Sequence, residues 1–291
     1  MFKNLLIIFF LIIAFESFAQ KEEILIGFQV PLDDNIYTSK TEVANIYYLE
    51  YLYYVKKDSS NDFYEKQFIK FDPADTSYTE HNYLRSSNTR YFPVVYVSYE
   101  QATNYCKWLE SILIQRMVEN PDIDQDKFLL KVRLPSIEEW IKMAIRYDYY
   151  LENTKWPNKF SSLPFKKSEL KNLIKTYDLD ISKREYYNKL REFMETNPIY
   201  MIENLRYDGN KDYFNYAINI NHTWPREKND EFMNIPYDLR GNVSEMTTTK
   251  GIAKGGNWQS TPNEIGIMDN IKYFKPANNI GFKCVCEFTE R

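Results

Sequence analysis

The chain has 291 residues, of which 44% are hydrophobic and 17% are aromatic. A chain of this length and composition can bury a large core, which excludes an intrinsically disordered protein. The formal net charge of -4 at pH 7 provides no basic surface for nucleic acid, so no nucleic-acid partner is expected. Because the chain has only two histidines, a zinc site built from histidine is not expected either.

The N-terminus has the three-part pattern of a secretory signal peptide. Lys3 gives a positive start, Leu5–Phe15 is an unbroken apolar run, and Ser17-Phe18-Ala19 places small residues before a cleavage site at Gln20. The alternative is a membrane anchor, but this run is shorter than the roughly 20 residues that a spanning helix needs. We therefore predict export, with residues 1–19 removed, to the periplasm, the outer membrane or the cell surface. No cysteine lies near the cleavage site, so a lipoprotein anchor is not expected. No second apolar run approaches spanning length, so an integral membrane protein is not expected either.

Strand and helix signals alternate in the first half of the chain. Residues 24–31 predict an opening strand, and the apolar spacing over 41–57 predicts a helix with a polar start. Residues 93–97 predict a short strand, and residues 128–134 predict another.

Two capping-box patterns mark helix starts. Ser98 is followed at the third position by Gln101, and Ser136 by Glu139. The helix expected after Ser98 carries apolar residues at three- and four-residue spacing, namely Ala102, Tyr105, Cys106, Leu109, Ile112 and Leu113. The helix expected after Ser136 is short and ends near Ile145.

The second half of the chain has little regular pattern. Residues from about 148 to 200 are rich in Lys, Glu, Asn and Tyr, and we interpret them as a helical insertion. Glycine-rich turns with short strands follow, and the last predicted strand covers residues 280–288. Mixed helices and strands with long loops predict an α+β fold with low regular content.

Six segments stand in a distinctive order: Thr41-Glu-Val-Ala-Asn45; Pro93 to Trp108; Arg133-Leu-Pro-Ser-Ile-Glu-Glu-Trp140; Tyr237-Asp-Leu-Arg-Gly-Asn-Val-Ser-Glu245; Lys254-Gly-Gly-Asn-Trp258; and Gly281-Phe-Lys-Cys284. Their succession resembles the formylglycine-generating enzyme (sulfatase-modifying factor) family. The resemblance implies a C-type-lectin-like variant fold, formed as one domain over residues 20–291 with the insertion at about 148–200.

Most residues of these motifs are expected to have structural roles. Gly255 and Gly256 predict a close backbone approach or a positive φ angle. Trp108, Trp140 and Trp258 are expected to be core rings rather than platforms for a substrate.

Catalysis in this family, as the resemblance implies, uses two cysteines five residues apart, just after the Gly-Gly motif. They bind copper(I), a soft ion that selects thiolates. Aligned from Gly255-Gly256, Ser260 stands at the first of these positions and Ile265 at the second. Serine is a hard, weak ligand and isoleucine has no donor atom, and no other cysteine lies between residues 258 and 281. We therefore expect a pseudoenzyme with no catalytic residues and no copper.

The resemblance also implies a calcium site. Its ligands would be the side chains of Asp238 and Glu245 and the backbone carbonyls of Gly241 and Val243, a set of oxygen donors that suits calcium. In the alternative interpretation, both acidic residues are loop residues with ordinary hydrogen bonds.

Cys106 and Cys284 occupy positions where family members can carry a structural disulfide. Cys286 is a rival partner for Cys106, because residues two apart on a strand point to the same face. Since Cys284 directly follows the Gly281-Phe282 pair, the pairing of Cys106 with Cys284 is preferred and Cys286 is the spare thiol. The alternative is three buried free cysteines.

Catalytically empty members of this family occur among the gliding-motility and type IX secretion lipoproteins of the Bacteroidota. A signal peptide ending Ala-Gln and a composition rich in Tyr, Asn, Lys and Ile resemble that group, although the lipoprotein cysteine is missing. We therefore expect a non-catalytic scaffold or protein-interaction domain with a partner in the cell envelope. The alternatives are an oxidoreductase with altered chemistry and a calcium-dependent ligand-binding module.

Overall fold

The computed structural model describes Phe28, residues 30–76, 78–120, 125–153, Pro236, and residues 238–260 and 266–290. The predicted signal peptide, most of the predicted insertion and Ile265 lie outside these residues. The described helices are α2 (Asn45–Asp58), α3 (Asn61–Gln67), a π-helix (Glu80–Leu84), α4 (Tyr99–Glu119), a 3₁₀ turn (Gln125–Lys127) and α5 (Ile137–Asn153). None of the helices in these ranges has the length and apolar content required to cross a membrane.

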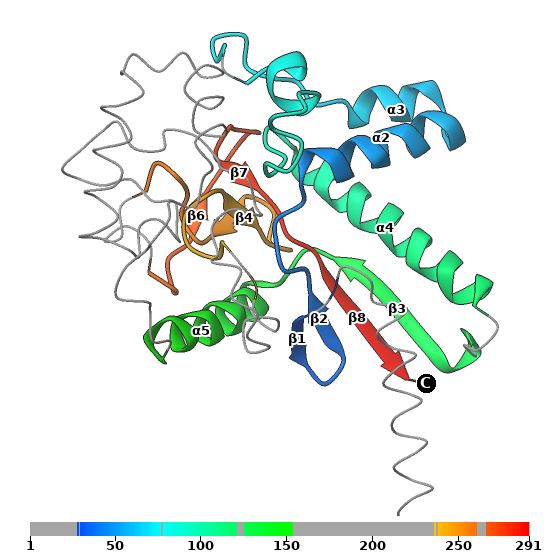
Figure 1. Cartoon of the computed structure of the whole chain (residues 1–291), viewed down its shortest axis with the longest axis vertical. Coiled ribbons are helices and arrows are strands. Elements are labelled where there is room, and N and C mark those ends of the chain that lie inside the picture. The colour runs from blue at the N-terminus through cyan, green and yellow to red at the C-terminus, as the bar shows by residue number, and fades with distance from the viewer. Residues whose placement is uncertain are drawn as a thin grey trace, which may run out of the picture.

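Four antiparallel strands form the first sheet of the described residues, in the order β1-β2-β8-β3 (Figure 1). Their bounds are Val30–Asp33 (β1), Ile36–Thr38 (β2), Phe128–Arg133 (β3) and Val285–Glu290 (β8). Phe128, Leu130 and Val132 are buried while the residues between them are exposed, as the two-residue period of a strand requires. The strand predicted over 128–134 is thus confirmed. The strand predicted over 24–31 lies mostly outside the described residues, and β1 begins near its end.

Helix α4 covers one face of this sheet. It packs along β3 and contacts α2, and Figure 1 shows both helices on the same side of the sheet. Its start is the predicted capping box: the N–H of Gln101 donates to Ser98 Oγ at 3.1 Å, and the N–H of Ser98 donates to Gln101 Oε1 at 2.8 Å. Ala102, Cys106 and Leu113 are buried on the predicted face, so this helix is confirmed.

Helix α5 begins with the second capping box. The N–H of Glu139 donates to Ser136 Oγ at 3.1 Å, and the N–H of Ser136 donates to Glu139 Oε2 at 2.7 Å. The helix continues to Asn153, past the predicted end near Ile145, so the first residues of the predicted insertion extend an existing helix. It contacts β1, at the edge of the first sheet that lies away from β3 (Figure 1).

Helix α2 begins four residues later than the range 41–57 predicts. Ala44 precedes it and provides no side-chain cap. The reason is that Val43 is held by two other segments: its N–H donates to the carbonyl of Phe282 at 2.9 Å, and its carbonyl accepts from the N–H of Val94 at 2.8 Å. These bonds fix the backbone in an extended form up to the first helical turn.

The prediction of a strand over 93–97 is wrong. This segment makes only an isolated bridge, between Pro93 and Ala44. Tyr96 has a φ angle of 60°, which lies outside the extended region and breaks any strand. Its N–H donates to the carbonyl of Ala277 at 3.0 Å, so the segment bonds to separate loops rather than to one neighbour.

A second sheet of four short strands, in the order β6-β5-β4-β7, is formed by the described C-terminal residues. The strands are Ser244–Met246 (β4), Ile252–Lys254 (β5), Ile271–Lys272 (β6) and Ile280–Gly281 (β7). β4 and β7 are parallel, and this register places Glu245 opposite Gly281. Helices and antiparallel strands in mixed order make the protein α+β, as predicted.

The strand predicted over 280–288 is in fact two strands in different sheets. β7 belongs to the second sheet and β8 to the first. The three residues between them turn to the segment before α2: the carbonyl of Phe282 accepts from Val43, and that of Cys284 accepts from Ser39 at 3.1 Å. The segment 282–284 therefore joins the two sheets.

All three cysteines are buried free thiols close to α4 and β8. The sulfur atoms of Cys106 and Cys284 lie 3.5 Å apart. Cys286 lies within β8, opposite Tyr37 of β2 and Val132 of β3. The structure thus brings together the pair that the resemblance implies, and its oxidation to a disulfide stays a prediction.

We predict that an oxidising buffer joins Cys106 to Cys284. Closing so long a loop would raise the free energy of unfolding by about 2–5 kcal/mol in the chain-entropy account. Peptide mapping without reduction identifies the bond, and urea unfolding with and without reductant measures its effect. Cys286→Ser should keep the bridge and Cys106→Ser should lose it. Alkylation of all three thiols without reduction would contradict the pairing.

Candidate functional site

The family motifs converge on a buried polar cluster, which we define as Glu42, Asp238, Asn242, Glu245 and Lys283. All five side chains are buried. They come from the segment before α2, from the loop leading into β4, from β4 itself and from the link between β7 and β8. Residues scattered over most of the chain therefore meet at one point in the core.

Lys283 is the positive member of this cluster. Its Nζ donates to Glu245 Oε1 at 2.6 Å and lies 3.8 Å from Glu42 Oε2, and none of the three side chains is exposed to solvent. Burial alone would lower the pKa of Lys283, but the carboxylates of Glu245, Glu42 and Asp238 together raise it. The lysine is therefore charged inside the core.

Glu42 and Glu245 both have pKa values above that of an ordinary glutamate. Burial raises the pKa of Glu42 to about 8, because the positive charge of Lys283 offsets only part of the desolvation and Asp238 and Glu245 add repulsion. Its Oε1 accepts from Nδ2 of Asn242 at 3.0 Å. Burial also raises the pKa of Glu245, an effect that Lys283 and the hydrogen bond from Trp140 oppose.

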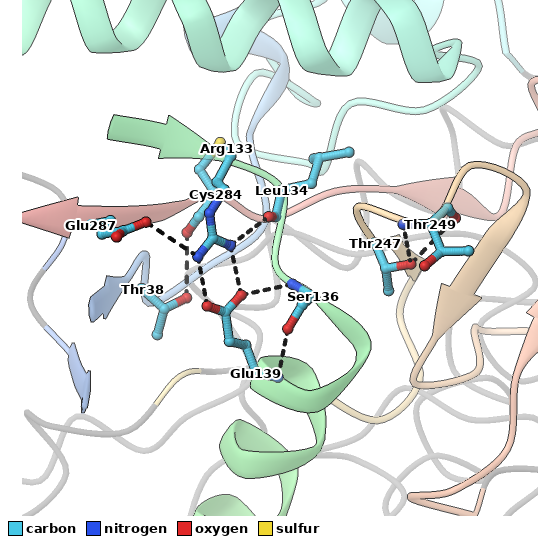
Figure 2. A network of polar contacts seen from close by, with 9 residues as sticks. All are labelled: Thr38, Arg133, Leu134, Ser136, Glu139, Thr247, Thr249, Cys284 and Glu287. Atoms are coloured by element: carbon cyan, nitrogen blue, oxygen red, sulfur yellow. Dashed lines mark hydrogen bonds and ion pairs between the residues drawn. The ribbon is translucent and has the colours of Figure 1, made fainter. Parts of the chain in front are cut away.

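Trp140 connects the cluster to α5. Its Nε1–H donates to Oε2 of Glu245, so both oxygens of that carboxylate accept from protein donors. The ring is held by the start of the helix, where Arg133 forms two bonds of 2.7 Å with the carboxylate of Glu139. Figure 2 shows this fork, with Glu287 of β8 reaching the same guanidinium at 3.7 Å. Such bidentate pairs fix orientation as well as distance.

The glycine pair of the fifth motif lets the backbone pass close to Trp140. Gly255 and Gly256 have φ angles of 91° and 69°, which confirms the predicted positive φ. A Cβ atom on Gly255 would lie 2.4 Å from the carbonyl oxygen of Leu239 and 3.0 Å from the Trp140 ring. A side chain at this position therefore has no room.

Lys254 is a second buried lysine that the sequence analysis did not identify. Its Nζ donates to the carbonyls of Ile267 and Asp269 at 2.7 Å and 2.6 Å, and it lies 5.3 Å from the centre of the Trp140 ring. Burial lowers the pKa of Lys254, an effect that Asp269 opposes. The lysine ties the loop before β6 to the cluster. Its position next to the glycine pair was the only sequence signal.

Ser260, at the first copper position, completes a turn. Its Oγ accepts from the N–H of Asn257 at 3.2 Å, and its own N–H donates to the carbonyl of Asn257 at 2.8 Å. The second position, Ile265, lies outside the described residues. Burial raises the pKa of Cys284 well above its ordinary value and that of Cys286 to about 12, so these two groups remain neutral thiols.

The residues assigned to calcium do not fit that ion at Glu245. Calcium needs a carboxylate whose oxygens are open to it, and here one oxygen accepts from Lys283 and the other from Trp140. Within the described ranges, no group of three or more His, Cys, Asp or Glu residues could hold a metal ion. The structure does bring Asp238 and Glu245 into one cluster, but with an ammonium group beside the carboxylates.

A cavity of about 600 Å³ lies between α2, α4 and the segment before α2. Tyr54, Tyr105 and Trp108 line it, together with the buried Glu42 and Cys284. The rings of Tyr54 and Trp108 are 5.9 Å apart. Nε1 of Trp108 is buried and has no hydrogen-bond acceptor among the described residues.

The three tryptophans expected in the core differ in their exposure. Trp140 and Trp258 are buried, as predicted. Trp108 is only partly buried, packs against the core and lines the cavity.

The model of the sulfatase-modifying factor enzyme 1-like domain matches residues 28–288. This match spans most of the chain, so the protein belongs to that family. No match was found among curated proteins.

Solved structures that match this chain include the Treponema denticola variable protein 1, with 13% identity, a TM-score of 0.42 and coverage of 87% of this chain and 84% of that one. CarF has 15% identity, a TM-score of 0.44 and coverage of 87% and 86%. PvdO from Pseudomonas aeruginosa has 14% identity, a TM-score of 0.44 and coverage of 89% and 90%.

The raised pKa of Glu42 predicts that stability depends on pH. Between the ordinary glutamate pKa of about 4.3 and the folded value, the folded chain binds a proton that the unfolded chain has lost. Stability should therefore fall as the pH rises through this window. In urea unfolding between about pH 5 and pH 8, the free energy of unfolding of Glu42→Gln should therefore rise relative to that of the wild type. The rise should be at most about 1.4 kcal/mol per pH unit.

Glu50→Gln is the matched control, because Glu50 lies exposed on α2. Its unfolding free energy should follow the wild type at each pH. Parallel pH profiles for Glu42→Gln and the wild type would show that Glu42 does not carry the proton.

Proposed function

We propose that this chain is a non-catalytic member of its family, which works outside the cytoplasm as a scaffold or protein-interaction domain. The observation that carries the proposal is the pair of residues at the copper positions, Ser260 and Ile265. Copper(I) selects soft sulfur ligands, and neither residue supplies one. The Ser260 hydroxyl already accepts a hydrogen bond within its own turn, from the N–H of Asn257.

The remaining thiols do not replace the missing pair. The chain has three cysteines, and all of them are buried between α4 and the first sheet. Copper(I) binds thiolates, whereas burial keeps Cys284 and Cys286 protonated at neutral pH. An oxidoreductase reaction of the family type would have to open this core.

The proposal includes a C-type-lectin-like variant fold and an envelope location. Short strands joined by long loops are compatible with that fold. The N-terminal pattern supports export, and the composition supports a place among the gliding-motility or type IX secretion members of the Bacteroidota. The envelope partner belongs to the same proposal.

A copper measurement tests the absence of catalysis. After incubation with copper(I) and removal of free metal, the wild type should retain no stoichiometric copper and should not oxidise a cysteine-containing peptide. The double variant Ser260→Cys, Ile265→Cys restores both thiols and should gain copper, whereas Ser260→Cys alone should hold it more weakly. One copper ion per wild-type chain, or turnover of the peptide, would refute the proposal.

Affinity purification from cell envelopes tests the scaffold role. A tagged full-length chain should co-purify with a defined envelope protein at fixed stoichiometry. Phe274 and Met268 flank β6 and are 94% and 73% exposed, so Phe274→Ser should weaken a contact made there and leave the melting temperature unchanged. A chain that purifies alone from envelopes under gentle cross-linking would argue against a scaffold.

A ligand-binding module is the second candidate, and the cavity beside Trp108 favours it. Aromatic walls suit a neutral sugar, whose ring can stack on them. Tryptophan fluorescence titrated with neutral oligosaccharides should then saturate, and Trp108→Phe should abolish the response. A flat titration over the whole panel would remove this candidate.

A further inference from the structure

A positive charge already occupies the centre of the polar cluster. The ammonium of Lys283 donates to Glu245 at 2.6 Å, lies 3.8 Å from Glu42, and also interacts electrostatically with Asp238. Three acidic side chains from different parts of the chain therefore act on one buried cation. A buried charge is tolerated only where such partners compensate its lost hydration.

Two of these acidic residues are the side-chain donors that the family resemblance assigns to calcium. A calcium ion would take carboxylate oxygens at about 2.3–2.6 Å, which is the distance at which the ammonium of Lys283 already holds Oε1 of Glu245. The other oxygen accepts from the indole of Trp140. A divalent ion at this carboxylate would thus stand next to a buried ammonium, where repulsion is strong because little water screens it.

The backbone fixes Lys283 in this place. Glu245 of β4 lies opposite Gly281 of β7 in the parallel register, and Lys283 follows two residues later. The carbonyl of Phe282, between them, accepts from the N–H of Val43, beside Glu42. The chain therefore has little freedom to withdraw the lysine from between the two glutamates.

We infer that Lys283 is an internal cation that takes the place of a divalent metal ion at this cluster, so that the protein does not need calcium there. The positive charge that a metal ion would bring from solution is carried instead by the Lys283 side chain. This inference concerns the cluster alone and holds whether or not the protein is a catalyst.

The wild-type protein gives the first test. Elemental analysis after dialysis against calcium chloride should find no stoichiometric calcium, and the melting temperature should be the same with calcium chloride and with a chelator. One bound calcium ion per chain, or a melting temperature that rises with calcium, would overturn the inference.

Variants at Lys283 give the second test. Lys283→Ala removes the charge and leaves space, so its melting temperature should fall by several degrees and should then rise when calcium chloride is added. Lys283→Arg keeps the charge and should show no response to calcium. Lys142→Ala, which removes an exposed lysine on α5, is the control for general effects of salt.

A variant that does not fold still gives an answer. If Lys283→Ala is unfolded in metal-free buffer, its refolding yield from urea is measured with and without calcium chloride, and calcium should restore folding. A Lys283→Ala protein that ignores calcium both in melting and in refolding would show that the lysine does not stand in for a metal ion.

Discussion

The buried ion pair between Lys283 and Glu245 is the interaction on which the arrangement of the motifs depends. Taking two ions out of water is unfavourable unless their geometry is good and their remaining hydrogen-bonding capacity is used. Here the indole of Trp140 donates to the second carboxylate oxygen, and Oε2 of Glu42 lies 3.8 Å from the ammonium. Removing one member would leave the others buried without compensation. The family motifs in this chain are thus requirements of packing and charge balance.

The packing around the ion pair also depends on the position of Trp140. The ring can reach Glu245 only because α5 starts at a fixed angle, which the fork between Arg133 and Glu139 holds. The ring also requires that residue 255 has no side chain, because the backbone of Gly255 passes against it. Lys254 lies over the same ring and ties down the loop before β6.

The sequence predicted the structure correctly where neighbouring residues determine it. Both capping boxes, the buried face of α4 and the positive φ angles at the glycine pair follow from a few neighbouring residues. The segment 93–97 looked like a strand because of its β-branched residues. Its backbone is instead set by distant partners, which no local pattern reveals.

The candidate site was only half predictable for the same reason. Asp238 and Glu245 were identified through the family resemblance. Glu42 and Lys283 were quoted within motifs but given no role, because charged residues are usually exposed and nothing local marks these two as buried. Their importance depends on the parallel register that brings Glu245 opposite Gly281, a contact between segments far apart in the chain. The break between β7 and β8 was missed because both halves have the same apolar pattern.

The position of β8 in the first sheet affects the order in which the protein can fold. This strand lies between β2 and β3, far from both in the sequence, so neither can complete its pairing until β8 is in place. Sheets closed by such distant segments form slowly, since a large loop must be ordered first. In a growing chain, this sheet would therefore stay open until β8 has been made.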